Sequence, residues 1–198
     1  ARPNNERVLA TPDTLAIMRA RYGEAAGGAL QPLPYGETVR IGEVDVRFVP
    51  AGHVLGSAQA VMEYRGCRIV VSGDYKRRAD PTCAPFELVP CDVFVTEATF
   101  GLPVFRHGDA AGEVNKLLAS VKLFPERAHL VGAYSLGKAQ RVIALLREAA
   151  PDAEGAGGIP LNLPVACQSL RDGGHASVRP DIVEKLVRGM GRDGRDQD

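Results

Sequence analysis

Three side chains suited to metal or proton chemistry each follow an apolar segment of the chain. His53 lies between two glycines after the run RFVP, Asp74 follows the run IVVSG, and Glu97 follows the run VFVT. Imidazole nitrogen and carboxylate oxygen are suitable ligands for zinc, manganese or iron. A catalytic zinc has three protein ligands and a two-metal site needs about twice that number, so His53 and Asp74 alone make no site. Taken singly, His53 fits a simple turn, Asp74 a turn cap and Glu97 an ion pair at a sheet edge.

Three positive charges, Lys76, Arg77 and Arg78, come directly after Asp74 and Tyr75. Beside a metal-binding carboxylate they would suit an anionic substrate such as a phosphodiester backbone, whereas the run by itself fits a solvated loop. The whole chain of 198 residues has 24 Lys and Arg and 24 Asp and Glu, so it carries no net charge. Binding of a polyanion therefore depends on a local patch such as this one.

The segment GAYSLGK, residues 132–138, matches the start of the P-loop pattern GxxxxGK[ST] and follows a predicted strand. Ala139 stands where a P-loop has the Ser or Thr that reaches magnesium, and no later strand supplies a second magnesium-binding aspartate. We therefore expect no nucleotide hydrolysis at this segment. A helix that begins here, with Lys138 at its start, is still able to hold a phosphate of another ligand.

The remaining histidines and the cysteines show no metal-ligand spacing. His129 lies in a predicted strand and is expected to be structural, His107 is expected at the surface, and His175 is assigned no role. The cysteines contain no C-x-x-C pair, so we expect free thiols rather than a structural zinc site or a disulfide framework. They are Cys67, Cys83, Cys91 and Cys167.

The hydrophobic pattern predicts an alternation of helices and strands that would carry these residues. Thr11 as N-cap, Pro12 at the first helical position and Gly23 as a stop predict a short helix over 11–23. The glycines and prolines between 27 and 34 predict a loop. The other predicted elements are hairpins over 39–49 and 58–72, a buried strand over 92–96, helices over 110–123 and 135–150, and a strand over 128–134.

Three segments, taken in this order, carry a resemblance to a known family. They are PAGHVLGSAQ (50–59), VVSGDYKRRAD (70–80) and FVTEATFG (94–101). Together they resemble the metallo-β-lactamase-fold nucleases of the β-CASP group. The likeness is greatest to the bacterial ligase-associated DNA exonucleases, with more distant kin among RNA 3′-end-processing endonucleases, and it covers about residues 1–150. The ordered triple is far more specific than any one of its motifs.

The resemblance implies a role for each candidate residue. His53 would be a metal ligand, and Asp74 would be the carboxylate that bridges two divalent ions, zinc or manganese. Glu97 corresponds to the acidic residue of the first β-CASP motif, so Asp74 and Glu97 would be catalytic. The implied reaction is hydrolysis of a phosphodiester by a metal-activated hydroxide. The cations expected to contact the substrate are Lys76, Arg77 and Lys138.

The resemblance also implies a fold class, α/β (α+β), and a division of the chain. Residues 1–100 would form a partial metallo-β-lactamase domain, an incomplete αββα sandwich. Residues 101–150 would form the start of an inserted β-CASP α/β domain. Residues 151–198 lose the pattern, and we expect them to form a divergent, disordered tail.

The family's His-x-His-x-Asp-His motif, which supplies most of the metal ligands, is absent from this sequence and would be expected just before Ala1. We therefore interpret the chain as a fragment of a metal-dependent nuclease and expect the fragment by itself to bind no metal. A DNA exonuclease is the first interpretation, and an RNA or DNA endonuclease is the second. The alternative is a catalytically inactive module of the same fold that binds nucleic acid or a partner protein. A thioester or lactam hydrolase of this fold is disfavoured by the cationic run and Glu97.

The expected partners are nucleic acid, DNA before RNA, and, by resemblance, DNA ligase or helicase proteins. The sequence has no apolar run approaching about 18 residues and no N-terminal signal pattern. We therefore expect no membrane association and a cytoplasmic location.

Overall fold

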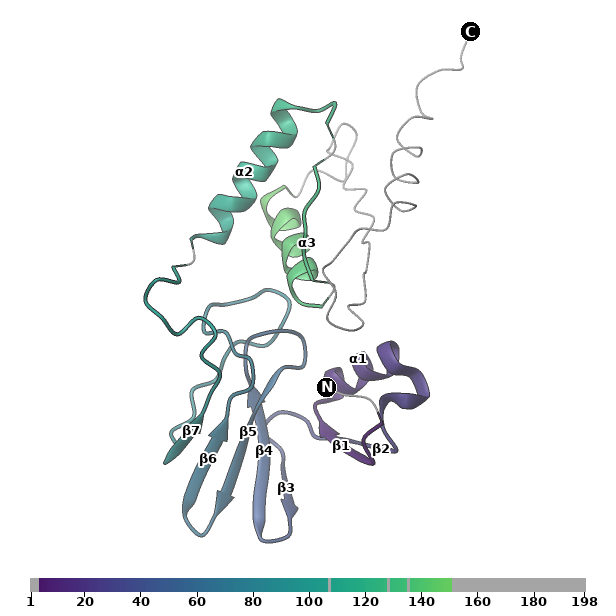
Figure 1. The fold of residues 1–198 in the computed structure, drawn as a ribbon, viewed down its shortest axis with the longest axis vertical. Coiled ribbons are helices and arrows are strands. Elements are labelled where there is room, and N and C mark those ends of the chain that lie inside the picture. The colour runs from purple at the N-terminus through teal and green to yellow at the C-terminus, as the bar shows by residue number, and fades with distance from the viewer. Residues whose placement is uncertain (1–3, 107, 128, 135, 151–198) are drawn as a thin grey trace.

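The computed structural model describes residues 4–106, 108–127, 129–134 and 136–150, which combine helices and strands (Figure 1). His107, His175, Cys167 and the predicted disordered tail over 151–198 lie outside the described residues. In the part of the chain that is described, no helix is long and apolar enough to cross a membrane.

The N-terminal residues form a small parallel β-α-β unit. Its elements are β1 (Arg7–Ala10), α1 (Pro12–Tyr22), the 3-10 helix η1 (Gly23–Ala26) and β2 (Ala29–Pro32). The Thr11 hydroxyl caps α1 by accepting from the backbone N–H of Thr14 at 3.3 Å, and α1 ends at Gly23, so the predicted helix is confirmed. The predicted loop is wrong where β2 forms, because residues 29–32 pair in parallel with β1 after the chain returns through α1.

The next segment forms a five-stranded sheet in the order β3-β4-β5-β6-β7. Both predicted hairpins are confirmed, with turns at Gly42 and at Arg65–Gly66, which have positive φ angles. The strands through β6 pair antiparallel, whereas β7 pairs parallel to β6. Their bounds are β3 (Thr38–Ile41), β4 (Val44–Pro50), β5 (Ala58–Tyr64), β6 (Cys67–Val71) and β7 (Val93–Val95).

Two helices follow the sheet and lie side by side above it in Figure 1. They are α2 (Ala110–Leu123), capped by the Asp109 carboxylate, and α3 (Lys138–Ala149), and both were predicted. The predicted strand over 128–134 is wrong in its described residues, 129–134, which have no strand conformation. Leu130 is 87% exposed, and no neighbouring strand among the described residues offers this apolar run a ladder of hydrogen bonds.

The apolar interior consists of three small clusters rather than one continuous core. One lies under α1, one joins α2 to α3, and the sheet contributes Val49, Val61 and Val70 from three adjacent strands. The strand over 92–96 was predicted to be buried, and this is wrong for β7, whose three residues are 45 to 50% exposed. Strand β7 is the outermost strand of the sheet, and its side chains stay about half exposed although the Phe94 ring contacts Tyr75.

Candidate functional site

The sheet topology brings the three candidate segments to one edge. Strands β4 and β6 both pair antiparallel with β5, so they run in the same direction, and β7 runs parallel to β6. The carboxyl ends of these three strands therefore lie at the same edge of the sheet. The segments that leave them there carry His53, Asp74 and Glu97, respectively.

The His53 turn, residues 51–57, is held in shape by Ser57. The Ser57 hydroxyl oxygen accepts from the backbone N–H groups of His53 at 3.0 Å and Val54 at 3.1 Å. The Ser57 main chain closes the turn, because its N–H donates to the Val54 carbonyl at 2.9 Å and its carbonyl accepts from the Ala51 N–H at 3.0 Å. Ser57 was not among the predicted site residues, although the spacing Gly-His-x-x-Gly-Ser was an available signal for its role.

The two glycines around His53 permit close backbone approach. Gly52 has φ 70°, and a Cβ there would clash with the carbonyl oxygen of Lys76. Gly56 has φ 76°, and a Cβ there would lie 2.7 Å from the backbone nitrogen of Thr14. The hydroxyls of Thr11 and Thr14 donate to the Gly56 carbonyl at 2.7 and 2.8 Å. Helix α1 and residues 72–80, called the Asp74 segment below, thus both contact the His53 turn directly.

His53 and Asp74 form a pair at the sheet edge. The Nε2 atom of His53 lies 3.9 Å from Oδ2 of Asp74, and the two side chains are 42% and 76% exposed. The turn before Asp74 begins at Ser72, which is fully buried and whose hydroxyl lies 3.2 Å from Oγ1 of Thr96. Because Thr96 directly precedes Glu97, this contact joins the segment that carries Asp74 to the segment that carries Glu97.

Glu97 is an anion close to His53. Hydrogen bonds from Thr99, whose backbone N–H donates to the Glu97 carboxylate at 2.7 Å, lower the pKa of Glu97 below its ordinary value. Burial has a smaller, opposing effect on that pKa, and the charge of His53 lowers it further. Glu97 is therefore ionised at neutral pH.

The three predicted substrate cations differ in their surroundings. Lys76 is only 23% exposed, and its ammonium pairs with the carboxylate of Asp80. Arg77 is exposed. Lys138 is exposed at the start of α3, with its ammonium 4.9 Å from the centre of the Tyr134 ring.

The start of α3 lies against the His53 turn. Gly137, which precedes the helix, has φ 86°, and a Cβ there would clash with the side chain of Val54. The Gly137 N–H donates to the side-chain oxygen of Gln140 at 2.9 Å, which caps the first turn. A P-loop directly follows a strand. The described residues before the pattern at 132–138, residues 129–134, form no strand, so they lack this feature of a P-loop. His129 contacts Ser120 and the Arg127 carbonyl instead, at 3.0 and 3.2 Å.

The donors brought together at this edge are too few for a two-metal centre. Among the described residues, no group of three or more His, Cys, Asp or Glu side chains has an arrangement that could hold a metal ion. His53 and Asp74 are of the right chemical type for two of the ligands, and a two-metal site requires about six. The described cysteines, Cys67, Cys83 and Cys91, are free thiols and contribute to no such group.

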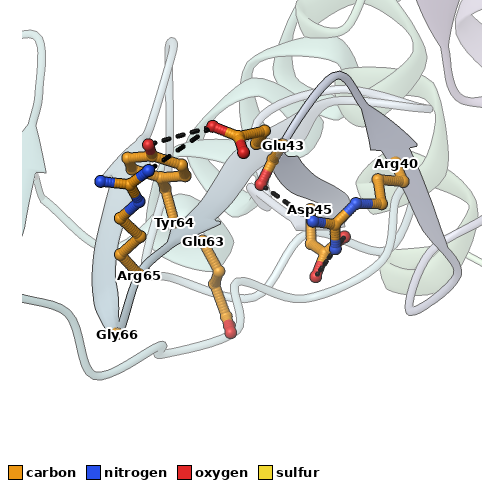
Figure 2. Close-up of a pocket in the computed structure, with 7 residues that line it drawn as sticks. All are labelled: Arg40, Glu43, Asp45, Glu63, Tyr64, Arg65 and Gly66. Carbon is orange, nitrogen blue, oxygen red and sulfur yellow. Dashed lines mark hydrogen bonds and ion pairs between the residues drawn. The ribbon is translucent and has the colours of Figure 1, made fainter.

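A shallow pocket of about 270 Å³ lies at the opposite end of the sheet, beside the hairpin turns (Figure 2). Two ion pairs lie within it. Arg40 lies 3.1 Å from Asp45, and Glu43 accepts from the Tyr64 hydroxyl at 3.1 Å and lies 3.9 Å from Arg65 (Figure 2). The third carboxylate, Glu63, pairs with Arg68 outside the pocket at 2.8 Å. Among the described residues, the carboxylates of this pocket belong to no group that could hold a metal ion.

No protein-family model matches the chain. Its sequence is 28% identical over 148 residues to a probable DNA ligase of Opitutus terrae, covering 73% of this chain and 14% of that protein. It is 31% identical over 124 residues to Endoribonuclease YSH1 of Gibberella zeae, covering 60% of this chain and 15% of the relative. The protein of the same name from Saccharomyces cerevisiae is 28% identical over 151 residues, covering 71% of this chain and 19% of the relative.

Among solved structures, the chain resembles a protein of unknown function from Enterococcus faecalis V583, with a TM-score of 0.43 and 15% identity. That match covers 73% of this chain and 39% of the other. The chain spans between 14 and 19% of the length of the three curated relatives named above. In sequence, it is thus similar to proteins named as endoribonucleases and as a DNA ligase.

Proposed function

We propose that this chain carries part of the active site of a metal-dependent phosphodiester hydrolase of the β-CASP metallo-β-lactamase type, acting on nucleic acid. The observation that carries the proposal is the pairing of His53 and Asp74, 3.9 Å apart at one sheet edge, the same edge at which Glu97 follows β7. The similarity to proteins named as endoribonucleases over 60 to 71% of this chain supports it.

His53 and Asp74 would supply two of the ligands that hold the metal ions. Bound divalent ions would activate a water as the nucleophile and polarise the phosphodiester. Glu97, held ionised by Thr99, is suited to hold a proton donor in place by accepting its hydrogen bond. His53 and Asp74 are two donors, whereas a two-metal site needs about six. The remaining ligands would therefore come from polypeptide outside the described residues.

We propose DNA rather than RNA as the substrate, and exonuclease rather than endonuclease action. The resemblance to ligase-associated exonucleases supports DNA, as does the similarity to a protein named as a probable DNA ligase. The similarity to endoribonucleases supports RNA. In either case the phosphodiester would contact cations at the same edge, of which Arg77 and Lys138 are exposed.

The test uses the protein expressed from its complete gene, stripped of metal and then given Mn²⁺ or Zn²⁺. End-labelled DNA and RNA oligonucleotides, single-stranded and duplex, report cleavage and its polarity. We expect metal-dependent cleavage that Asp74→Asn reduces at least about a hundredfold. The control is Asp45→Asn, which removes an exposed carboxylate at the opposite end of the sheet and should leave cleavage unchanged. Unimpaired turnover in Asp74→Asn would contradict the assignment.

A catalytically inactive module is the second candidate. It is favoured by one observation, that the described residues contain no group of three metal-ligating side chains. Such a module would bind oligonucleotides equally well with and without EDTA and would cleave none of them. The same preparation therefore separates the two functions, because the hydrolase requires metal for turnover and the module shows binding alone.

A further inference from the structure

Asp80 is a buried carboxylate that no part of the proposed reaction uses. Its side chain is 3% exposed and lies six residues beyond Asp74 in the chain. One carboxylate oxygen accepts from the backbone N–H of Thr82 at 3.0 Å and from its hydroxyl at 2.6 Å. The other pairs with the Lys76 ammonium and lies 3.5 Å from Nε of Arg141, in the first turn of α3.

Burial of a charge is costly unless partners compensate, and here they do. Burial alone would raise the pKa of the Asp80 carboxyl. The hydrogen bonds from Lys76 and Thr82, together with the charge of Lys76, outweigh this effect and hold the pKa below its ordinary value. Asp80 is thus an anion at neutral pH, held between two cations from different elements.

The two cations come from two different parts of the candidate site, Lys76 from the segment that carries Asp74 and Arg141 from α3. Lys76 is two residues from Asp74, and its backbone N–H donates to the Ala51 carbonyl at 2.9 Å, one residue before Gly52. Arg141 lies one helical turn beyond Gly137, the residue that packs against Val54. Asp80 therefore joins the Asp74 segment to the helix whose first residue is Lys138.

We propose that Asp80 is a positioning residue, which fastens the start of α3 to the Asp74 segment and so holds Lys138 and Arg141 beside the His53–Asp74 pair. The consequence for substrate binding rests on the proposed function, whereas the attachment of α3 does not. Arg141 makes this contact more than a surface ion pair, because its Nε is buried and has no hydrogen-bond partner among the described residues. Its position depends on the charge of Asp80.

The first experiment measures amide hydrogen exchange by mass spectrometry in the 198-residue chain. Asp80→Asn should speed exchange about tenfold both in residues 72–80 and in residues 137–145, and leave the β3–β4 hairpin unchanged. Arg141→Gln, which acts from the helix side at a partly exposed position, should give the same pattern. The double variant should add little to either single variant.

Two further variants separate this contact from general destabilisation. Arg141→Lys keeps the positive charge and should restore most of the protection in both segments. Glu113→Gln removes a carboxylate from an exposed pair with Lys116 on α2 and should change neither segment. Faster exchange confined to residues 72–80 in Asp80→Asn, or full additivity of the two single variants, would overturn the proposal.

The second experiment measures binding of fluorescein-labelled single-stranded DNA and RNA 20-mers in EDTA. Loss of a negative charge alone would tighten binding to a polyanion. Displacement of Lys138 and Arg141 predicts the opposite, a several-fold weaker affinity for Asp80→Asn than for Glu113→Gln. Equal or tighter binding by Asp80→Asn would refute the role in substrate binding. A wild-type chain that binds neither oligonucleotide would count against the proposed function, and hydrogen exchange would then decide the role of Asp80.

Discussion

Gly52 packs directly against the backbone carbonyl of Lys76, so that the His53 turn and the Asp74 segment meet through their main chains. A Cβ on Gly52 would clash with that carbonyl oxygen and would lie 2.9 Å from the backbone nitrogen of Phe86. Next to this contact, the Lys76 N–H donates to the Ala51 carbonyl at 2.9 Å. The separation of His53 and Asp74 is therefore set by backbone packing, and the side chains remain free to accept other contacts.

Gly52→Ala should separate the two segments and destabilise the fold. The substitution combines an unfavourable left-handed φ, worth about 1–2 kcal/mol, with a backbone clash of about 1–3 kcal/mol. Gly42→Ala is the matched control, since Gly42 has φ 61° and open space around the added Cβ, and it should show the first cost alone. Urea unfolding measures both free energies, and equal losses for the two variants would contradict the close contact at Gly52.

Ser57→Ala should loosen the His53 turn while leaving the sheet intact. The variant removes the acceptor for the N–H groups of His53 and Val54, at a cost of about 1–3 kcal/mol. Amide exchange of these two residues, followed by nuclear magnetic resonance, should become faster by a factor of ten or more. Ser120→Ala, a substitution on α2 that removes a contact with His129, serves as control and should leave both amides unchanged.

The site segments could be predicted because their signals are local. Alternating apolar residues defined both hairpins, and the Gly-His and Gly-Asp turns marked the strand ends where His53 and Asp74 lie. The burial of β7 could not be read from its apolar run, because burial depends on what packs against the strand. The run Val93–Val95 has the composition of an internal strand, but among the described residues it forms the outermost, half-exposed strand of the sheet.

Contacts between distant residues carried no signal in the sequence. The strand β2 depends on β1, with which it pairs only after α1 has reversed the chain. Similarly, Asp80 stands in a proline-rich loop, and its pairing with Arg141 appears only when α3 packs beside the sheet edge. Lys76 was expected to contact substrate, and that remains a prediction, but its pairing with Asp80 could not be foreseen from a run of three cations.

Arg77 and Lys76 should differ in what they do for nucleic-acid binding. Arg77 is exposed, so Arg77→Ala should weaken oligonucleotide binding and lower the slope of log affinity against log salt by about 0.7 for a single strand. Lys76→Met should chiefly destabilise the fold, by about 1–3 kcal/mol, because the buried Asp80 loses its hydrogen-bonded cation. Fluorescence anisotropy across a salt series, together with urea unfolding, distinguishes these effects. A larger salt-slope change in Lys76→Met would reverse the assignment.

The contribution of Asp80 to stability should depend on pH in one direction. Its folded pKa lies below the ordinary value of 3.8, so its stabilising effect is complete above that pH and is lost as the pH falls through the folded pKa. At pH 7, Asp80→Asn should therefore cost about 3 kcal/mol, and this difference from the wild type should shrink below about pH 4. Asp45→Asn, at an exposed pair with Arg40, should cost less than about 1 kcal/mol throughout. Urea unfolding from pH 3 to 7 measures both series, and a cost for Asp80→Asn that persists unchanged at pH 3 would show that its charge is not what holds α3.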